Sequence, residues 1–113
     1  MGVEVYVTVP QPVINERVSF TATAYFRDGD SEQASTTAKY RIDCLTTGTT
    51  VVDWTSLTPA VSIAIPVKSA DNRIIGGNKI EKKQITVSSD PGEATETRSV
   101  KTWKVKNIRG FES

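Results

Sequence analysis

The chain of 113 residues contains no histidine and only one cysteine, Cys44. Histidine is the commonest general base and the commonest metal ligand, so its absence excludes the serine–histidine and cysteine–histidine arrangements of nucleophilic catalysis. A single cysteine without histidine does not build an ordinary zinc site and does not form an intrachain disulfide. The composition therefore predicts a protein that is not an enzyme, with no catalytic residue, no metal ligand and no cofactor.

Long hydrophobic runs and an excess of charge are also absent. No apolar segment approaches the ~20 residues that a membrane-spanning helix requires, and the net charge is only +1. Met1 is followed at once by a strand pattern, so we expect no secretory signal peptide. Small secreted sandwiches often carry a disulfide, so its absence favours folding in a reducing cytoplasm. We expect neither a membrane nor a nucleic acid as partner.

Helical periodicity is missing as well, and a two-residue alternation takes its place. No stretch of about 11 residues shows the i, i+3, i+4 spacing of an amphipathic helix. Apolar and polar side chains instead alternate cleanly through residues 3–9, 17–26 and 60–68. Successive side chains of a strand point to opposite faces, so each segment has one apolar face. Further strands are predicted at residues 37–45, 50–54, 81–89 and 96–107.

Turn signals separate these seven strands. Pro10-Gln11-Pro12 ends the first strand, and residues 13–16 are predicted to form a short turn before the second. Gly48 marks a hairpin, and Asp90-Pro91-Gly92 marks another turn. About seven short strands with such turns are typical of an all-β, antiparallel β-sandwich of the Ig-like or fibronectin-III-like kind, here as one domain over residues 1–113.

The alternation also predicts which side chains are buried. Cys44 lies on the apolar phase of its strand, so we expect a buried packing thiol rather than a nucleophile. Phe20 is expected in the core, and Trp54 and Trp103 are expected in the core or at its edge rather than as carbohydrate platforms. Pro66 lies on the polar phase of its strand, which indicates an edge strand or a bulge.

Five bases near the C-terminus form a candidate protein interface. They have no acid among them and are Arg98, Lys101, Lys104, Lys106 and Arg109. Two interpretations compete: the lysines protect an edge strand from unwanted pairing, or they dock on an acidic surface. The alternation places Lys104 and Lys106 on the same strand face as Arg98.

Two loops contain further candidates. Ile74 and Ile75, beside Gly76-Gly77 in the longest predicted loop, either fold back under the sheet or are exposed for a partner. Asp28-Gly29-Asp30, followed by Glu32, contains the oxygen ligands that calcium prefers. It fits no EF-hand loop, whose twelfth position would be Lys39, so a solvated turn is the better interpretation.

Several runs resemble small Ig-like virion proteins encoded by tailed bacteriophages. They are residues 9–12, 40–49, 53–56, 84–87 and 103–107. The resemblance implies a non-enzymatic structural protein of the virion, in the favoured case a capsid decoration or cement protein that stabilises the head from its outer surface. The implied partners are the major capsid protein or another virion protein, with self-association on the particle.

The resemblance also implies a location and an alternative. The location is the capsid exterior, which the protein reaches after folding in the host cytoplasm. The alternative is a carbohydrate-binding or adhesion module on a phage tail or another surface. The resemblance supplies no catalytic residue, and a fold of this kind does not by itself fix a function.

Overall fold

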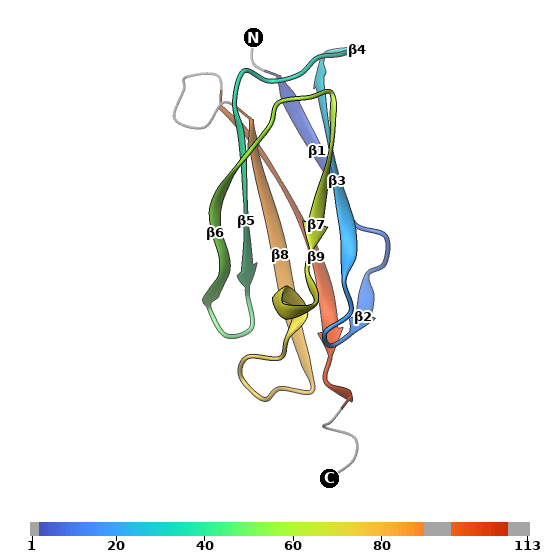
Figure 1. The fold of residues 1–113 in the computed structure, drawn as a ribbon, viewed down its shortest axis with the longest axis vertical. Helices are drawn as coiled ribbons and strands as arrows, with labels where there is room; N and C mark the ends of the chain where they lie inside the picture. The colour runs from blue at the N-terminus through green and yellow to red at the C-terminus, as the bar shows by residue number, and fades with distance from the viewer. Residues whose placement is uncertain (1–2, 90–95, 109–113) are drawn as a thin grey trace.

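The computed structural model describes residues 3–89 and 96–108, which form an all-β sandwich of two sheets (Figure 1). The first sheet contains β1 (Glu4–Thr8), β3 (Phe20–Asp28), β4 (Ser31–Glu32) and β7 (Ser62–Val67). The second sheet contains β2 (Val13–Asn15), β5 (Ala38–Cys44), β6 (Thr49–Leu57), β8 (Ile80–Ser89) and β9 (Thr97–Lys106). The prediction of an antiparallel β-sandwich is confirmed.

The strand order places β3 and β8 inside their sheets. In the first sheet β3 pairs antiparallel with β1, with β7 and with the short β4. In the second sheet the order is β2-β9-β8-β5-β6, and every pair is antiparallel except β2–β9, which is parallel. Pro66 lies in β7, whose sheet partner in the described part of the chain is β3, so the predicted edge position is confirmed.

The core lies between the sheets, where the alternation predicted it. Every second residue is buried in β1 and from Ala22 to Phe26 of β3, and the fully buried Phe26 is the largest of these side chains. The second sheet contributes Trp103, which is 1% exposed and meets the ring of Phe20 edge-on, with centroids 5.1 Å apart. Cys44 is fully buried, as predicted.

A short 3-10 helix lies at the end of β7. This helix, η1 (Ser69–Asn72), follows β7 and lies in the longest predicted loop (Figure 1). The buried Asn72 accepts a hydrogen bond from Trp103 Nε1 at 2.8 Å and donates one to the carbonyl of Val18 at 2.7 Å. Asn72 therefore satisfies the indole N–H and joins η1 to β9 and to the connection between β2 and β3. Within the described ranges, no helix has the length and apolar character needed to span a membrane.

The region between the first two long strands differs from the prediction. Residues 13–16 were expected to be a turn, but β2 pairs with β9 there and buries Ile14. The prolines end β1 and move the chain across to the second sheet, where the Pro12 carbonyl accepts the Lys104 N–H at 2.8 Å. Arg17 adopts a left-handed φ of 63°, so β3 begins only at Phe20 and Val18 stays exposed.

Candidate functional site

The outer face of the second sheet carries two of the predicted interface lysines. On β9 the side chains of Trp103 and Val105 point into the core, so Lys104 and Lys106 point outward and are exposed. The alternation predicted this orientation correctly. Lys104 lies between β2 and β8, because Val13 pairs with it on one side and Lys82 on the other.

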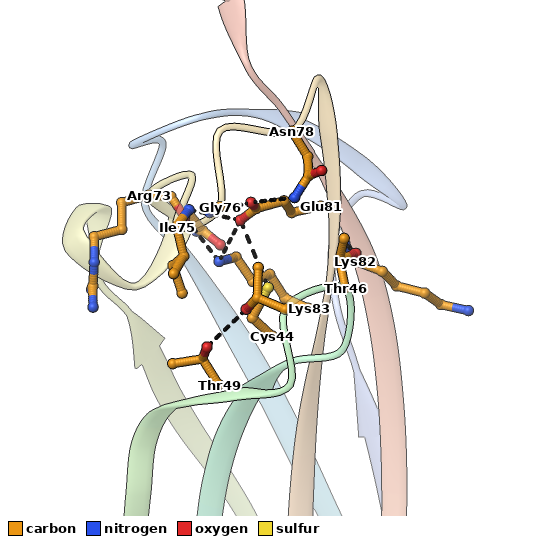
Figure 2. Close-up of polar contacts among 12 residues, drawn as sticks. Cys44, Thr46, Thr49, Arg73, Ile75, Gly76, Asn78, Glu81, Lys82 and Lys83 are labelled. Atoms are coloured by element: carbon orange, nitrogen blue, oxygen red, sulfur yellow. Dashed lines mark hydrogen bonds and ion pairs between the residues drawn. The ribbon is translucent and has the colours of Figure 1, made fainter.

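Neighbouring strands complete what we call the basic face, made of Val13, Ile80, Lys82, Lys104 and Lys106. Lys82 and Lys104 are directly opposite one another, and so are Ile80 and Lys106. Figure 2 shows Lys82 pointing away from the buried side of β8. Val13 and Ile80 are 41% and 47% exposed, so apolar surface flanks the three ammonium groups.

The charge of the basic face is not compensated by ion pairs among the described residues. In the portion of the chain that the structure describes, none of its three lysines takes part in an ion pair. Two like charges directly opposite on adjacent strands destabilise a sheet. The basic face is therefore complementary to a protein surface that presents carboxylates to the lysines and apolar side chains to Val13 and Ile80.

The interpretation of these lysines as edge protection is wrong for Lys104 and Lys106. Edge protection requires a strand with a free row of backbone groups. At these two positions β9 is paired on both sides, by β2 and by β8. The prolines that redirect the chain after β1 bring β2 to that edge and cover it.

The other predicted bases do not join the basic face. Arg98 forms an ion pair with Glu96 at 2.9 Å. Lys101 has the opposite strand phase and lines an open hollow beside β9 with Val9 and Pro12. Arg109 lies outside the described residues.

Trp54 lies on the outer face of the second sheet and not at the core or its edge as predicted. Its ring is 5.6 Å from the guanidinium carbon of Arg41 and 5.3 Å from that of Arg98, and both arginines point outward. Ser88 pairs with Arg98 in register and is fully buried although it faces outward, so this cluster covers the sheet there. Alternation did not predict this because the β5–β6 register shifts near Ile42.

A buried carboxylate lies at the start of β8, on the side opposite Lys82. Glu81 Oε1 accepts the Ile75 N–H at 2.8 Å, and Oε2 accepts the Gly76 N–H at 2.7 Å (Figure 2). Asn78 Nδ2 donates to Oε2 at 3.0 Å, and the thiol of Cys44 lies 3.7 Å from Oε1. Hydrogen-bond donors of the protein thus contact both oxygens, so this carboxylate fixes the loop to β8 and β5.

Lys83 is the counter-ion of Glu81. Its Nζ lies 3.5 Å from Glu81 Oε1 and donates to the Arg73 carbonyl at 2.8 Å, and both charged side chains are 0% exposed. Burial acts to raise the pKa of the Glu81 carboxyl, but the three hydrogen bonds and the Lys83 charge outweigh burial and lower that pKa to about 2. Glu81 is therefore ionised in the folded protein at neutral pH.

The same contacts determine where the predicted loop residues lie. Ile74 packs against the hydrophobic core and is only partly exposed. Ile75 is also partly exposed, and its backbone is fixed by the hydrogen bond to Glu81. The loop thus folds back under the sheet at Ile74, and it is not brought together with the basic face by any contact that the structure records.

The acidic turn after β3 forms a hairpin. Asp28 pairs with Ser31, and Gly29 takes a φ of 62° between them, which favours glycine. Over residues 3–89 and 96–108, no three histidine, cysteine or acidic side chains lie close enough together to hold a metal ion. Independence of metal remains a prediction for solution.

Comparisons of the chain with family models, with curated proteins and with solved structures gave no match. No relative therefore supplies a function or a site residue for this chain. What the protein does has to be inferred from its surface chemistry, and the basic face is the strongest feature of that surface.

Proposed function

We propose that this protein is a non-enzymatic structural component of a tailed-phage virion, attached to the outer surface of the head through the basic face. The observation that carries the proposal is the group of three exposed lysines, unpaired in the described residues and flanked by exposed Val13 and Ile80. The partner is the major capsid protein or another virion protein that presents carboxylates. No catalytic step is involved, because the contribution is binding energy.

The strand order supports the Ig-like part of the proposal. In Ig-like domains the first, second and fifth strands share one sheet, and the third, sixth and seventh share the other. Without the short β2 and β4, the chain places β1, β3 and β7 in one sheet and β5, β8 and β9 in the other, with β6 added beside β5. This order agrees with the resemblance to Ig-like virion proteins.

The proposed mechanism is stabilisation by added interface. The ammonium groups attract the molecule to an acidic shell, and burial of the apolar flank strengthens the contact once it forms. Many copies that bridge neighbouring capsid subunits would resist separation of those subunits, because each copy adds interface area. Such a protein stabilises the head only while it is bound, so the fraction of capsid sites that it occupies is the quantity to measure.

Charge reversal tests the attachment. The variant Lys104→Glu/Lys106→Glu is expected to lower the affinity for virions by about tenfold or more, because it replaces attraction with repulsion at the proposed interface. Attachment of the unchanged protein is expected to weaken as salt rises, since charges at a surface are screened over about 8 Å at physiological ionic strength. Occupancy on virions stripped of the native protein is measured by sedimentation and gel densitometry.

The matched control reverses two exposed lysines outside the basic face. Lys39→Glu/Lys68→Glu makes the same change in net charge, and both side chains are exposed. The control variant is expected to bind like the unchanged protein. Equal loss in both variants would indicate attraction by net charge alone, and equal retention in both would contradict docking through the basic face.

The carbohydrate-binding alternative would need an exposed aromatic platform. Trp54 is not well placed for this role, because its ring already contacts the guanidinium groups of Arg41 and Arg98. Trp103 is buried. Neither tryptophan therefore favours the alternative as the function of the second sheet.

A further inference from the structure

The outer face of the first sheet carries a pair of exposed tyrosines. Tyr6 of β1 and Tyr25 of β3 are directly opposite in the antiparallel register and are 50% and 45% exposed. Among the described residues, the large apolar side chains that are exposed include two aromatic ones, and these are Tyr6 and Tyr25. Their inward neighbours, Val5, Ala24 and Phe26, are buried, so the two rings stand on a rigid sheet.

On the side of the pair towards Thr8, the neighbouring outward side chains are small and uncharged. Thr8 and Thr23 form the next outward pair on β1 and β3, and Ser62 lies beside Tyr25 on β7. At the other side of the tyrosines the surface is hollowed. Tyr6, Tyr25, Arg27, Gly29 and Asp30 line an open hollow of about 480 Å³, at the hairpin between β3 and β4.

Polar groups surround this hollow. The Tyr6 hydroxyl donates to Glu4 Oε2 at 2.6 Å, and Glu4 is opposite Arg27 in the register. Arg27 Nη2 donates to the Asp30 carbonyl at 2.9 Å, which holds the guanidinium at the edge of the hollow. The Glu4 carboxylate and the Arg27 guanidinium thus lie beside the two aromatic rings.

We propose that this hollow is a binding site for a neutral oligosaccharide. A sugar ring presents C–H groups that pack on an aromatic face, and hydroxyl groups that exchange hydrogen bonds with carboxylates and a guanidinium. One acidic residue, Asp30, and one basic residue, Arg27, line the hollow, and Glu4 lies beside Tyr6. These groups give the hollow no excess of positive charge, which disfavours a phosphate or another anionic ligand. The size of the hollow is within the range of small-molecule sites, and its openness to solvent suits a weak, extended ligand.

The proposed sugar site is separate from the surface proposed to attach the protein to the head. It lies on the other sheet and shares no residue with the basic face, so a molecule docked through the basic face would leave the tyrosines facing away from the shell. Glycan binding and attachment can therefore succeed or fail separately. A cross-strand tyrosine pair also stabilises a sheet, but that role needs neither a hollow nor polar groups around it.

A titration followed by NMR tests the site on the isolated protein. Isotope-labelled protein is titrated with cellohexaose, maltohexaose and chitohexaose, and with sialyllactose as the anionic probe. At least one neutral hexasaccharide is expected to shift the backbone signals of Tyr6, Tyr25, Arg27 and Gly29, with a dissociation constant near the millimolar range. Sialyllactose is expected to cause smaller shifts in the same residues.

Variants distinguish a sugar site from a purely structural pair. Tyr6→Thr/Tyr25→Thr removes both rings and keeps strand-forming residues, and is expected to weaken sugar binding at least tenfold. The control Thr21→Ala alters the same face beside Pro66 and is expected to bind like the unchanged protein. Absence of shifts with all three neutral sugars would overturn the proposal, as would sugar-induced shifts that persist in the double variant. Concentration-dependent dimers that the double variant abolishes, without sugar shifts, would assign the tyrosines to self-association and overturn it too.

Discussion

Replacing Glu81 with glutamine is expected to lower the free energy of unfolding by about 3–5 kcal/mol at neutral pH. The variant leaves the fully buried Lys83 ammonium without its counter-ion. It also places an amide NH₂ where one oxygen now accepts a backbone N–H from Ile75 or Gly76. Urea unfolding followed by circular dichroism measures the loss.

A double-mutant cycle separates the ion pair from the hydrogen bonds. Lys83→Met removes the buried charge, and Glu81→Gln/Lys83→Met removes both charges together. The double variant is expected to lose less stability than the sum of the two single losses, because no unpaired charge remains buried. Strictly additive losses would show that Glu81 and Lys83 do not stabilise one another.

The pH dependence of stability also tests the interactions of the Glu81 carboxylate. The pKa of Glu81 is lowered from 4.5 to about 2 in the folded protein, so its contribution is fully present above pH 4.5 and disappears as the pH falls towards 2. This shift corresponds to roughly 3 kcal/mol of stability. The stability of Glu81→Gln is therefore expected to fall less steeply than that of the unchanged protein over this pH range. Parallel curves for the two proteins would contradict the lowered pKa.

Replacing Trp103 with alanine is the second change with a large expected effect, a loss of about 3–5 kcal/mol. The variant opens a cavity under Phe20 and leaves the buried Asn72 without the indole N–H that it now accepts. Trp103→Phe keeps an aromatic ring and removes the hydrogen bond, so it should cost less than alanine. Guanidinium unfolding measures both variants, and a loss below about 1 kcal/mol for alanine would show that this part of the core is loosely packed.

The long strands could be predicted from the sequence because one physical rule determines them. In β1, and from Ala22 to Phe26 of β3, every second side chain is buried, so the two-residue period alone identifies the side of the strand that faces the core. Strand β2 has only three residues, too few for a period to be recognised. It forms because the chain crosses from the first sheet to the second after β1 and pairs there with β9. This pairing is a tertiary contact, so the local sequence does not predict it.

The candidate site was predicted only in part. Lys104 and Lys106 were recognised because they belong to one strand with a clear phase. Lys82 joins them through the register between β8 and β9, which is a tertiary property. The sequence analysis did not identify the ion pair of Glu81 and Lys83. Both residues have the same strand phase as the buried Ile85. Two opposite charges on the inward phase of a strand indicate a buried ion pair, so the sequence did contain this information.

The most direct test of the proposed function is the position of this protein on purified virions of the tailed phage that, under the proposal, encodes it. Quantitative mass spectrometry should find the protein in a fixed ratio to the major capsid protein, and electron cryomicroscopy should show the sandwich on the head exterior. The proposal predicts that Lys82, Lys104 and Lys106 face acidic side chains of the shell, with Tyr6 and Tyr25 turned to solvent. Absence of the protein from intact virions, or a bound orientation with the basic face turned to solvent, would contradict it.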